Sequence, residues 1–470
     1  MGLYQMLSDY AGEDVCPMHM PGHKRRALHG PDLPWHLDIS EIGDFDNLHA
    51  PEGIFLEAEE RAARLWGSGA AHLLINGSTG GLLAGIYTLT RPGDVILMAR
   101  NCHKAVYHAV ELFGLSPVYL DPPTVAGTGI PGSVSPAEVG RIVAARPDIR
   151  LVVLTSPTYE GVLSDVGAIG AVLRGHGIPL FVDEAHGAHL GLSAHFPPSA
   201  ISQGADLVQQ SIHKTLPSLT QTAILHLRAG VIPPERMRHA LGLFQSTSPS
   251  YPLLASIDGC VALMRDRGEE LLGAWRARLE AFYQTMGELR HLRLLTGDTD
   301  SRHIYAHDPG KLTIITEGTP LSGRCLLAAM REQFGIELEM AQDGYALAMT
   351  SLANTEAHFT RLGYALRQID GRCESAPPRP AIALPPMPEQ AIPAGEALRL
   401  LRGQMAFADS VGRISGAYIW VYPPGVPIVT PGSRITAEVA ECLKELTDRG
   451  VVLRSTYGTV RGLIEVVDNP

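Results

Sequence analysis

Lys214 is the residue whose sequence surroundings most directly suggest chemistry. It lies in QQSIHKTL, between His213 and Thr215, just past the apolar run 206–211. A lysine whose amine is shielded from water has a lowered pKa and can form a Schiff base with a carbonyl group. The alternative is an ordinary surface charge, and other motifs must decide between the two.

A second motif, VDEAHGAHLG, ends an apolar run with Asp183 and continues with Glu184, His186 and His189. Such a carboxylate could belong to a metal site, or it could pair with a cationic ring nitrogen. The spacing is neither HExxH nor its reverse, so the pattern favours the ring-nitrogen partner over a metal site.

The stretch NGSTGG (76–81) offers Ser78 and Thr79 between a strand-like run and a helical stretch. Glycines allow close backbone approach, and hydroxyls at a helix N-terminus bind anions such as phosphate. No GK[ST] follows, so it is not a Walker loop. The same residues would also occur in a capped helix that begins with a glycine turn and binds no anion.

The stretch NCHKA (101–105) places His103 directly after another apolar run. A histidine at a strand end can stack on a ring or donate a proton, although many such residues merely begin a helix. A phosphate site, a stacking ring, an acid for a pyridine nitrogen and an imine-forming lysine are together what pyridoxal phosphate requires. The four motifs therefore predict this cofactor.

The elements between these motifs explain how they could meet. Short apolar runs alternate with helical stretches, which predicts an α/β fold with a mainly parallel central sheet and helices on both faces. Ligands of such sheets bind at the carboxyl ends of the strands, where all four motifs fall. The expected strands are 72–75, 95–99, 151–155, 179–183 and 206–211, and the expected helices are 54–66, 81–89, 104–113 and 165–177.

The 470 residues exceed what one hydrophobic core usually holds, so several domains are expected. A long helix over about 255–290 should end the first of them. Strands at 312–317 and 345–350 should belong to the next, and the last should carry a helix followed by strand-like 418–432. The predicted units are an arm (1–53), a major cofactor-binding domain (54–290), a small α+β domain (291–375), a proline-rich connector (376–395) and a C-terminal domain (396–470).

Composition narrows the class of partner. The net charge of −11 argues against nucleic acid or an anionic membrane and leaves a small molecule as the expected ligand. Six cysteines without a CxxC pair favour a reducing compartment. The start of the chain is not typical of a signal peptide, and no apolar run is long enough to cross a bilayer, so a cytoplasmic location is predicted.

The sequence resembles the Orn/Lys/Arg decarboxylases, pyridoxal-phosphate enzymes on the aspartate-aminotransferase fold. It looks like the shorter form of that family, which lacks an N-terminal wing domain. The motifs that carry the resemblance run in the family's order through nearly the whole chain: HMPGHK (19–24), LHAPEGI (48–54), NGST (76–79), CHKA (102–105), DEAHG (183–187), SIHKTL (211–216), TSPSY (247–251) and YPPGVPIVTPG (422–432).

The resemblance implies a decarboxylase of an amino acid, favouring a basic one (arginine, lysine or ornithine) and releasing the amine and CO2. It also implies a homodimer, or a higher homo-oligomer, with active sites at the dimer interface. Lys214 or His213 would return a proton to the substrate carbon. The implied roles are Lys214 as the Schiff-base residue with His213 beside it, Asp183 at the pyridine nitrogen, His103 and Ala185 on the ring faces, His186 near the ring, Ser78, Thr79 and Ser211 at the phosphate, and Ser248 at a partner subunit's phosphate.

One position departs from the family pattern. Members usually carry an acid after the last glycine of YPPGVPIVTPG, where it suits a cationic substrate tail, but this chain has Ser433 and then Arg434. Either another acid replaces it or the substrate is not basic. The candidate replacements are Glu52, Asp44, Asp46 and Glu184.

Two other functions stay open at this stage. A different reaction with the same cofactor, such as transamination or a Cα lyase reaction, is one. An aminotransferase needs an arginine for the substrate carboxylate, which Arg413, Arg434 or Arg454 could supply. A binding protein without catalysis is the other, and the presence of Lys214 and Asp183 argues against it.

Overall fold

The computed structural model describes residue 14 and the ranges 16–18, 46–377, 384–421 and 425–468. The HMPGHK motif from residue 19 onward, Asp44 and the YPP of the C-terminal motif lie outside the described residues. Within the described part of the chain, no helix combines the length and the apolar character needed to cross a membrane.

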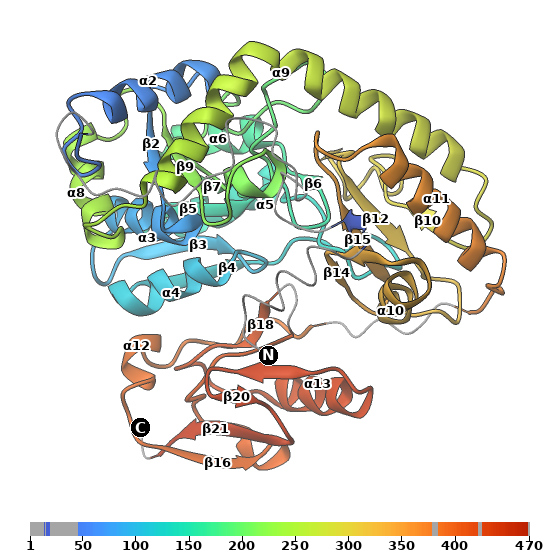
Figure 1. Cartoon of the computed structure of the whole chain (residues 1–470). Helices are drawn as coiled ribbons and strands as arrows, with labels where there is room; N and C mark the ends of the chain where they lie inside the picture. The colour runs from blue at the N-terminus through green and yellow to red at the C-terminus, as the bar shows by residue number, and fades with distance from the viewer. Residues whose placement is uncertain (1–13, 15, 19–45, 378–383, 422–424, 469–470) are drawn as a thin grey trace, which may run out of the picture.

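A seven-stranded sheet forms the centre of the largest unit (Figure 1). Neighbouring strands pair in parallel except at β9, which runs antiparallel to both β2 and β8. Every residue of β7 and β8 is buried, as strands covered on both faces should be. The order across the sheet is β2 (Ala70–Leu74), β9 (Ala223–Leu227), β8 (Leu207–Gln210), β7 (Leu180–Asp183), β5 (Ile149–Thr155), β3 (Val95–Ala99) and β4 (Ser116–Leu120).

Helices cover both faces of this sheet, which the apolar runs predicted. α2 (Ile54–Trp66) and α4 (Lys104–Phe113) have the expected bounds. α3 packs beside α4 and α8, and α5 packs beside α6. Strands β4 and β9 and helices α5 and α8 are additions to the expected elements. The remaining bounds are α3 (Gly77–Leu89), α5 (Pro136–Ala145), α6 (Val166–His176) and α8 (Pro234–Phe244).

Glycines let α3 lie directly on the sheet. A methyl group on Gly85 would sit 2.4 Å from the Phe181 ring, and one on Gly81 would sit 1.7 Å from the side-chain oxygen of Gln209. Only a residue without a side chain fits at such distances. The helix also begins earlier than expected, so Ser78 and Thr79 lie in its first turn.

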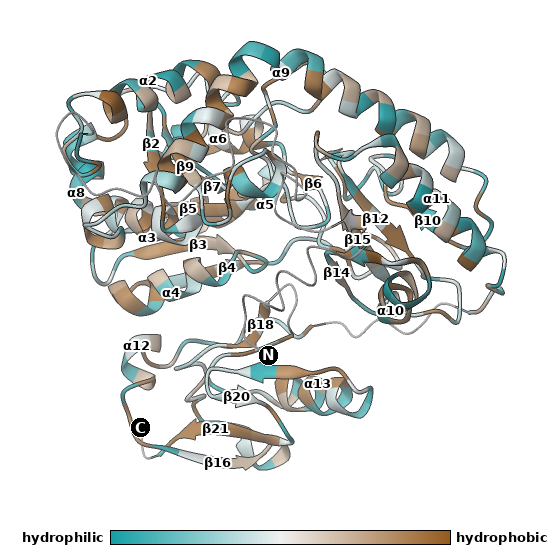
Figure 2. Ribbon diagram, in the orientation of Figure 1, coloured by the Kyte–Doolittle hydropathy of each residue, from teal (hydrophilic) through white to brown (hydrophobic). Residues whose placement is uncertain are grey.

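The long helix α9 (Tyr251–Met286) runs from the large unit to a second, smaller one (Figure 1). There the two expected strands are present as β12 and β15, and the structure shows that they pair antiparallel. Figure 2 shows the strands of the central sheet largely hydrophobic, whereas α9 carries both colours along its length. The smaller unit consists of β10 (Arg293–Leu294), β12 (Lys311–Ile315), β15 (Tyr345–Met349), β14 (Met340–Ala341), α10 (Gly323–Phe334) and α11 (Glu356–Asp370), with β13 (Ile336–Leu338) paired to β1 (Cys16–Met18).

The C-terminal unit has its own hydrophobic core and two small sheets. The expectation of a helix before residues 418–432 is wrong in its order. In the described part of this unit only the single turn α12 and the short 3₁₀ helix η3 (Ala408–Ser410) precede them, because residues 402–406 pair as a strand with β21, and the main helix follows. The elements are α12 (Ala394–Ala397), β16 (Arg402–Ala406), β17 (Ile419–Val421), β18 (Val426–Val429), α13 (Ala437–Asp448), β19 (Leu453–Ser455), β20 (Gly458–Thr459) and β21 (Leu463–Val467).

Hydrogen bonds fasten this unit to the large one beside α4 (Figure 1). Buried Arg100 donates to the carbonyl oxygens of Pro385 and Pro427. The Tyr418 hydroxyl donates to the carbonyl oxygen of Tyr107. A buried guanidinium needs such acceptors, so these bonds fix the position of the C-terminal unit.

Candidate active site

Asp183 and Lys214 follow neighbouring parallel strands, as the sequence predicted. Asp183 ends β7 and pairs with Gln209 of β8, and Lys214 lies in the single helical turn α7 (Ile212–Thr215) that follows β8. Because the carboxyl ends of parallel strands meet at one edge of a sheet, this register brings the two side chains close enough for each charge to shift the pKa of the other.

The Lys214 amine is hydrogen bonded to the His186 ring, with 2.9 Å between Nζ and Nε2. Burial lowers the pKa of Lys214 to about 8, although the charge of Asp183 opposes the shift. Burial also lowers the pKa of His186, and the Lys214 cation adds to this, so the imidazole is neutral and can accept the hydrogen bond. Lys214 therefore has a much larger reactive, neutral fraction near neutral pH than an exposed lysine.

Asp183 is buried, and its Oδ1 accepts a hydrogen bond of 3.1 Å from the Ala185 backbone N–H. Burial raises the pKa of this carboxyl, while the charge of Lys214 lowers it. A cation at this position would favour the ionised form further. The geometry thus suits an acid that pairs with a protonated ring nitrogen.

His103 caps the N-terminus of α4, where Nδ1 accepts from the Ala105 N–H at 3.2 Å. The residue is partly open to solvent, although many protein atoms lie around its ring. This partial burial lowers its pKa, and the nearby Lys214 cation lowers it further. A neutral ring that is open to solvent could stack on a planar ligand, and that role stays a prediction.

Two of the predicted phosphate residues meet at the start of α3. Ser78 Oγ lies 2.6 Å from Ser211 Oγ and accepts a hydrogen bond of 3.2 Å from Gln209 Nε2. Thr79 is exposed in the same helical turn. Hydroxyls and backbone N–H groups at a helix N-terminus form an anion site, so the arrangement fits a phosphate group.

His213 and Ser248 each hydrogen bond with a residue outside the groups described so far. His213 Nδ1 is 2.8 Å from the carbonyl oxygen of Thr222, to which it donates. Ser248 is exposed on the loop between α8 and α9, where it hydrogen bonds with Ser246. Among the residues that the structure describes, Ser248 therefore hydrogen bonds within its own loop rather than with the Lys214 cluster.

Glu184 and His189 of the DEAHGAH stretch each form polar contacts with different residues, away from Lys214. Glu184 accepts from Gln210 Nε2 at 2.7 Å and from the Ala200 N–H, and burial raises its pKa to about 8. His189 Nε2 lies 3.2 Å from Asp308 Oδ1. Among the residues that the structure describes, no three His, Cys, Asp or Glu side chains converge as a metal would require.

A second lysine was missed by the sequence reasoning. Lys311 is fully buried, and its Nζ donates to Asp308 Oδ2 at 2.7 Å and to the carbonyl oxygen of His186 at 2.8 Å. This ion pair fixes the backbone of the residue whose ring contacts Lys214. Its only sequence signal is a charged residue at the start of KLTII, the otherwise apolar strand β12.

Two further residues were also missed, Tyr159 and Glu339. The Tyr159 ring centroid lies 4.2 Å from that of His186 and 6.0 Å from Lys214 Nζ. The Tyr159 hydroxyl donates to Glu339 Oε1 at 2.7 Å. Tyr159 follows β5 in SPTYEG, and the end of a buried parallel strand was the available signal.

The structure answers part of the question raised by Ser433. This side chain is buried in the C-terminal unit, with its Oγ 2.8 Å from Thr430 Oγ. Asp46 accepts from four backbone N–H groups around the start of α2; these bonds lower its pKa although partial burial raises it. Glu52 is exposed, and Glu184 is held by Gln210. Asp46 and Glu184 are therefore occupied by structural bonds.

The three arginines considered for a substrate carboxylate also hydrogen bond within the C-terminal unit. Arg413 donates to the carbonyl oxygen of Val467, Arg434 to that of Gly412, and Arg454 to Thr459 Oγ1.

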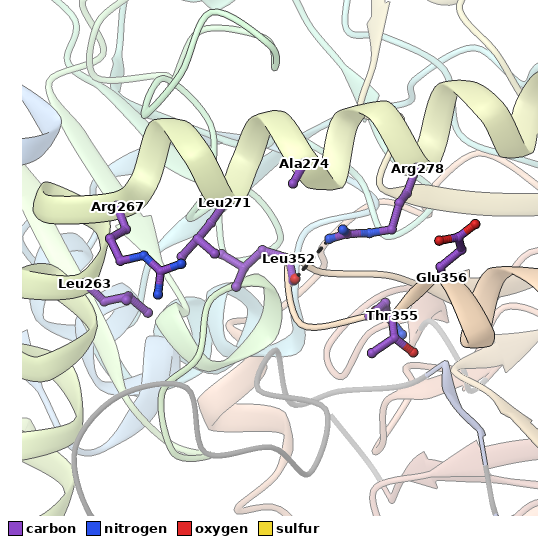
Figure 3. Close-up of a pocket in the computed structure, with 9 residues that line it drawn as sticks. Leu263, Arg267, Leu271, Ala274, Arg278, Leu352, Thr355 and Glu356 are labelled. Atoms are coloured by element: carbon purple, nitrogen blue, oxygen red, sulfur yellow. Dashed lines mark hydrogen bonds between the residues drawn. The ribbon is translucent and has the colours of Figure 1, made fainter.

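A separate surface pocket lies between α9 and the start of α11 (Figure 3). Its volume is about 320 Å³, and Arg278 donates there to the carbonyl oxygen of Leu352. None of the predicted site residues lines it. The lining residues are Leu263, Arg267, Leu271, Ala274, Arg278, Leu352, Asn354, Thr355 and Glu356.

Comparison with known proteins places this geometry in a family. The model of the Orn/Lys/Arg decarboxylase major domain matches residues 1–313. The uncharacterized protein YaaO of Bacillus subtilis is 35% identical over 465 residues, covering 94% of this chain and 94% of its own. The arginine decarboxylase of Halalkalibacterium halodurans is 29% identical, covering 98% of this chain and 97% of its own.

A solved structure confirms the fold class. The constitutive lysine decarboxylase of Escherichia coli superposes with a TM-score of 0.77 at 21% identity, covering 92% of this chain and 75% of its own. The mainly parallel sheet with helices on both faces is the predicted aspartate-aminotransferase-like fold. The resemblance found in the sequence motifs is confirmed by the family match: the chain belongs to the Orn/Lys/Arg decarboxylase family of lyases.

Proposed function

We propose that this protein decarboxylates a basic amino acid, releasing the amine and CO2, with pyridoxal phosphate as its cofactor. Family membership supports the reaction class, and relatives named arginine decarboxylase and lysine decarboxylase support a basic substrate. The observation that carries the proposal is the meeting of Lys214, with its pKa of about 8, and buried Asp183 at one edge of the sheet.

The residues present fit this cofactor. Pyridoxal phosphate supplies, when bound, an aldehyde that condenses with amines and a ring that accepts the electron pair left by CO2. Lys214 would hold it covalently and Asp183 would keep its ring nitrogen protonated. His103 and Ala185 would lie on the ring faces, and Ser78, Thr79 and Ser211 would bind its phosphate.

Proton movement can be assigned to the atoms around Lys214. The neutral His186 ring accepts a hydrogen bond from Lys214 Nζ, so it can hold the amine in place. His213 is oriented by its bond to the Thr222 carbonyl oxygen, which fixes which nitrogen carries hydrogen. Either Lys214 or His213 would return the proton to the substrate carbon after CO2 leaves.

We also propose that the active unit is a homodimer. Ser248 lies on an exposed loop and contacts Ser246 rather than the Lys214 cluster. That position suits a residue that reaches the phosphate site of a second subunit. Size-exclusion chromatography with light scattering would test this, and a Ser248→Ala variant should bind cofactor more weakly without changing the assembly.

Product analysis tests the reaction directly. Purified protein with pyridoxal phosphate is incubated with arginine, lysine, ornithine and a panel of neutral and aromatic amino acids, and products are identified by mass spectrometry. The amine of a basic amino acid is the expected product. If the product is the amine of a neutral or aromatic amino acid, the enzyme is a decarboxylase of a non-basic substrate. If the product is a keto acid, the reaction is a transamination and not a decarboxylation.

A further inference from the structure

Gln221 has an uncommon backbone conformation close to the predicted phosphate site. It lies between α7 and β9, and its φ is 85°. Residues other than glycine rarely have a φ of this sign, and where they do, surrounding contacts hold them in it. Such conformations cluster at functional sites, so the contacts of Gln221 point to a role for this residue.

Two hydrogen bonds join Gln221 to the segment that leads into α3. Its side-chain Nε2 donates to the Ile75 carbonyl oxygen at 2.5 Å, and its own carbonyl oxygen accepts from the Gly77 N–H at 2.9 Å. The Ile75 N–H donates to Gln245 Oε1 at 2.9 Å. Two glutamine side chains therefore hold both backbone polar groups of Ile75, just before Ser78.

The next residue, Thr222, holds the turn that carries Lys214. Its carbonyl oxygen accepts from the Ile212 N–H at 3.1 Å and from His213 Nδ1 at 2.8 Å. Neighbouring residues of one loop thus bond to the phosphate segment and to the lysine turn. Because adjacent Cα atoms lie about 3.8 Å apart across a trans peptide, the loop ties the positions of these two segments to each other.

This loop is itself anchored to the long helix α9. Ser218 Oγ lies 2.9 Å from Ser256 Oγ, and the Leu219 N–H donates to the same oxygen at 3.2 Å. The Thr222 hydroxyl donates to Ser218 Oγ at 2.8 Å. The loop therefore has a fixed base from which it can position both segments.

The chemistry of pyridoxal phosphate makes this spacing important. Its aldehyde and its phosphate are carried by one rigid ring, so the protein must present an amine and an anion site at a matching separation. The N–H groups in the first turn of a helix have no acceptor within the helix and bind anions. In α3 this turn begins at Gly77, which Gln221 holds.

We propose that Gln221 is a positioning residue that sets the phosphate site at the correct distance from Lys214. It acts through residues 75–77, while Thr222 beside it fixes the lysine turn. This inference rests on the proposed function, because it requires a phosphate-bearing cofactor at Lys214.

The test measures cofactor binding without turnover. Cofactor-free wild type, Gln221→Ala and Gln221→Gly are titrated with pyridoxal phosphate and with pyridoxal, which lacks the phosphate. The visible absorbance of the lysine-linked compound gives each dissociation constant, and urea unfolding gives the stability of each protein. Gln203→Ala is the matched control, because Gln203 Nε2 also donates to a backbone carbonyl oxygen, that of Pro198, in the loop that precedes β8.

Gln221→Ala should weaken the binding of pyridoxal phosphate about five- to tenfold, because the lost hydrogen bond lets residues 75–77 shift. Its affinity for pyridoxal should stay near the wild-type value, since no phosphate then has to match the position of the lysine. Gln221→Gly should lose as much affinity for pyridoxal phosphate as Gln221→Ala, although glycine adopts this φ without strain. Gln203→Ala should match wild type with both compounds.

Three results would overturn the inference while the proposed cofactor stands. The first is a wild-type preference for pyridoxal phosphate over pyridoxal in Gln221→Ala. The second is an equal loss of affinity for both compounds, which would show a general effect on the site. The third is wild-type binding by Gln221→Gly, which would assign the effect of alanine to backbone strain.

A different result would remove the proposed cofactor as well. If wild type binds pyridoxal phosphate no more tightly than pyridoxal, the phosphate site is absent and both proposals fail. If Gln221→Ala does not fold, Gln221→Gly decides alone, because glycine accepts the backbone conformation of this position.

Discussion

Two enclosed lysines touch the same histidine and have opposite surroundings. Lys214 Nζ bonds to the His186 ring, whereas Lys311 Nζ bonds to the His186 carbonyl oxygen and to the Asp308 carboxylate. Asp183 acts on Lys214 through its charge, while Asp308 forms a direct ion pair with Lys311. Burial alone thus does not make a lysine reactive; the absence of a bonded counter-charge at the amine does.

The largest expected effect is on turnover by Lys214→Ala. Removing the amine that we propose for covalent attachment should lower kcat by at least about a thousandfold and abolish the absorbance of covalently bound cofactor. Steady-state assays and an absorbance spectrum measure both. Lys444→Ala, on the exposed face of α13, is the control. Turnover at the wild-type rate in Lys214→Ala would contradict the reactive role that distinguishes Lys214 from Lys311.

Lys311→Met should affect folding instead. It leaves the Asp308 carboxylate buried without its cation, which costs about 3–4 kcal/mol of unfolding free energy. Burial raises the pKa of Asp308, but the charges and hydrogen bonds of Lys311 and His189 together outweigh it and hold the pKa well below its usual range. Urea unfolding followed by circular dichroism measures the loss. A loss of unfolding free energy below about 1 kcal/mol would show that the Lys311–Asp308 ion pair does not stabilise the fold.

Replacing Asp183 should mainly lower turnover, whereas replacing Asp308 should mainly lower stability. Asp183→Asn should retain part of the cofactor binding but lower kcat about a hundredfold, because an amide cannot keep a pyridine nitrogen protonated. Asp308→Asn should lower stability more than kcat. Cofactor titration and steady-state kinetics on both variants measure these effects. Equal losses of kcat in Asp183→Asn and Asp308→Asn would contradict the functional difference between the two aspartates.

The smallest expected effect is on the pH at which Lys214 reacts with an amine-labelling reagent. In cofactor-free protein, Lys214 should react with an amine reagent at half its maximal rate near pH 8, because its pKa is lowered to about 8 and only the neutral amine reacts. The rate should fall below that pH and level off above it. Peptide mass spectrometry follows Lys214 and Lys311 separately. A midpoint for Lys214 near that of an exposed lysine would contradict the lowered pKa.

Much of this site followed from the sequence. Motifs at the ends of apolar runs identified Lys214, Asp183, His103 and Ser78, because a parallel sheet places all its carboxyl strand ends at one edge. The same reasoning gave the fold class and the bounds of α2 and α4. It missed β9, whose antiparallel direction leaves no separate mark in a short apolar run.

The residues that only the tertiary structure supplied lie far away in sequence. Glu339 reaches Tyr159 and Lys311 reaches His186 because β12, β14 and β15 of the small unit face the end of the large sheet. No local pattern encodes such a meeting. Residue types at strand ends determined which chemistry is available. The packing of two units determined which charges surround it, because the partners of a buried charge are chosen by three-dimensional proximity.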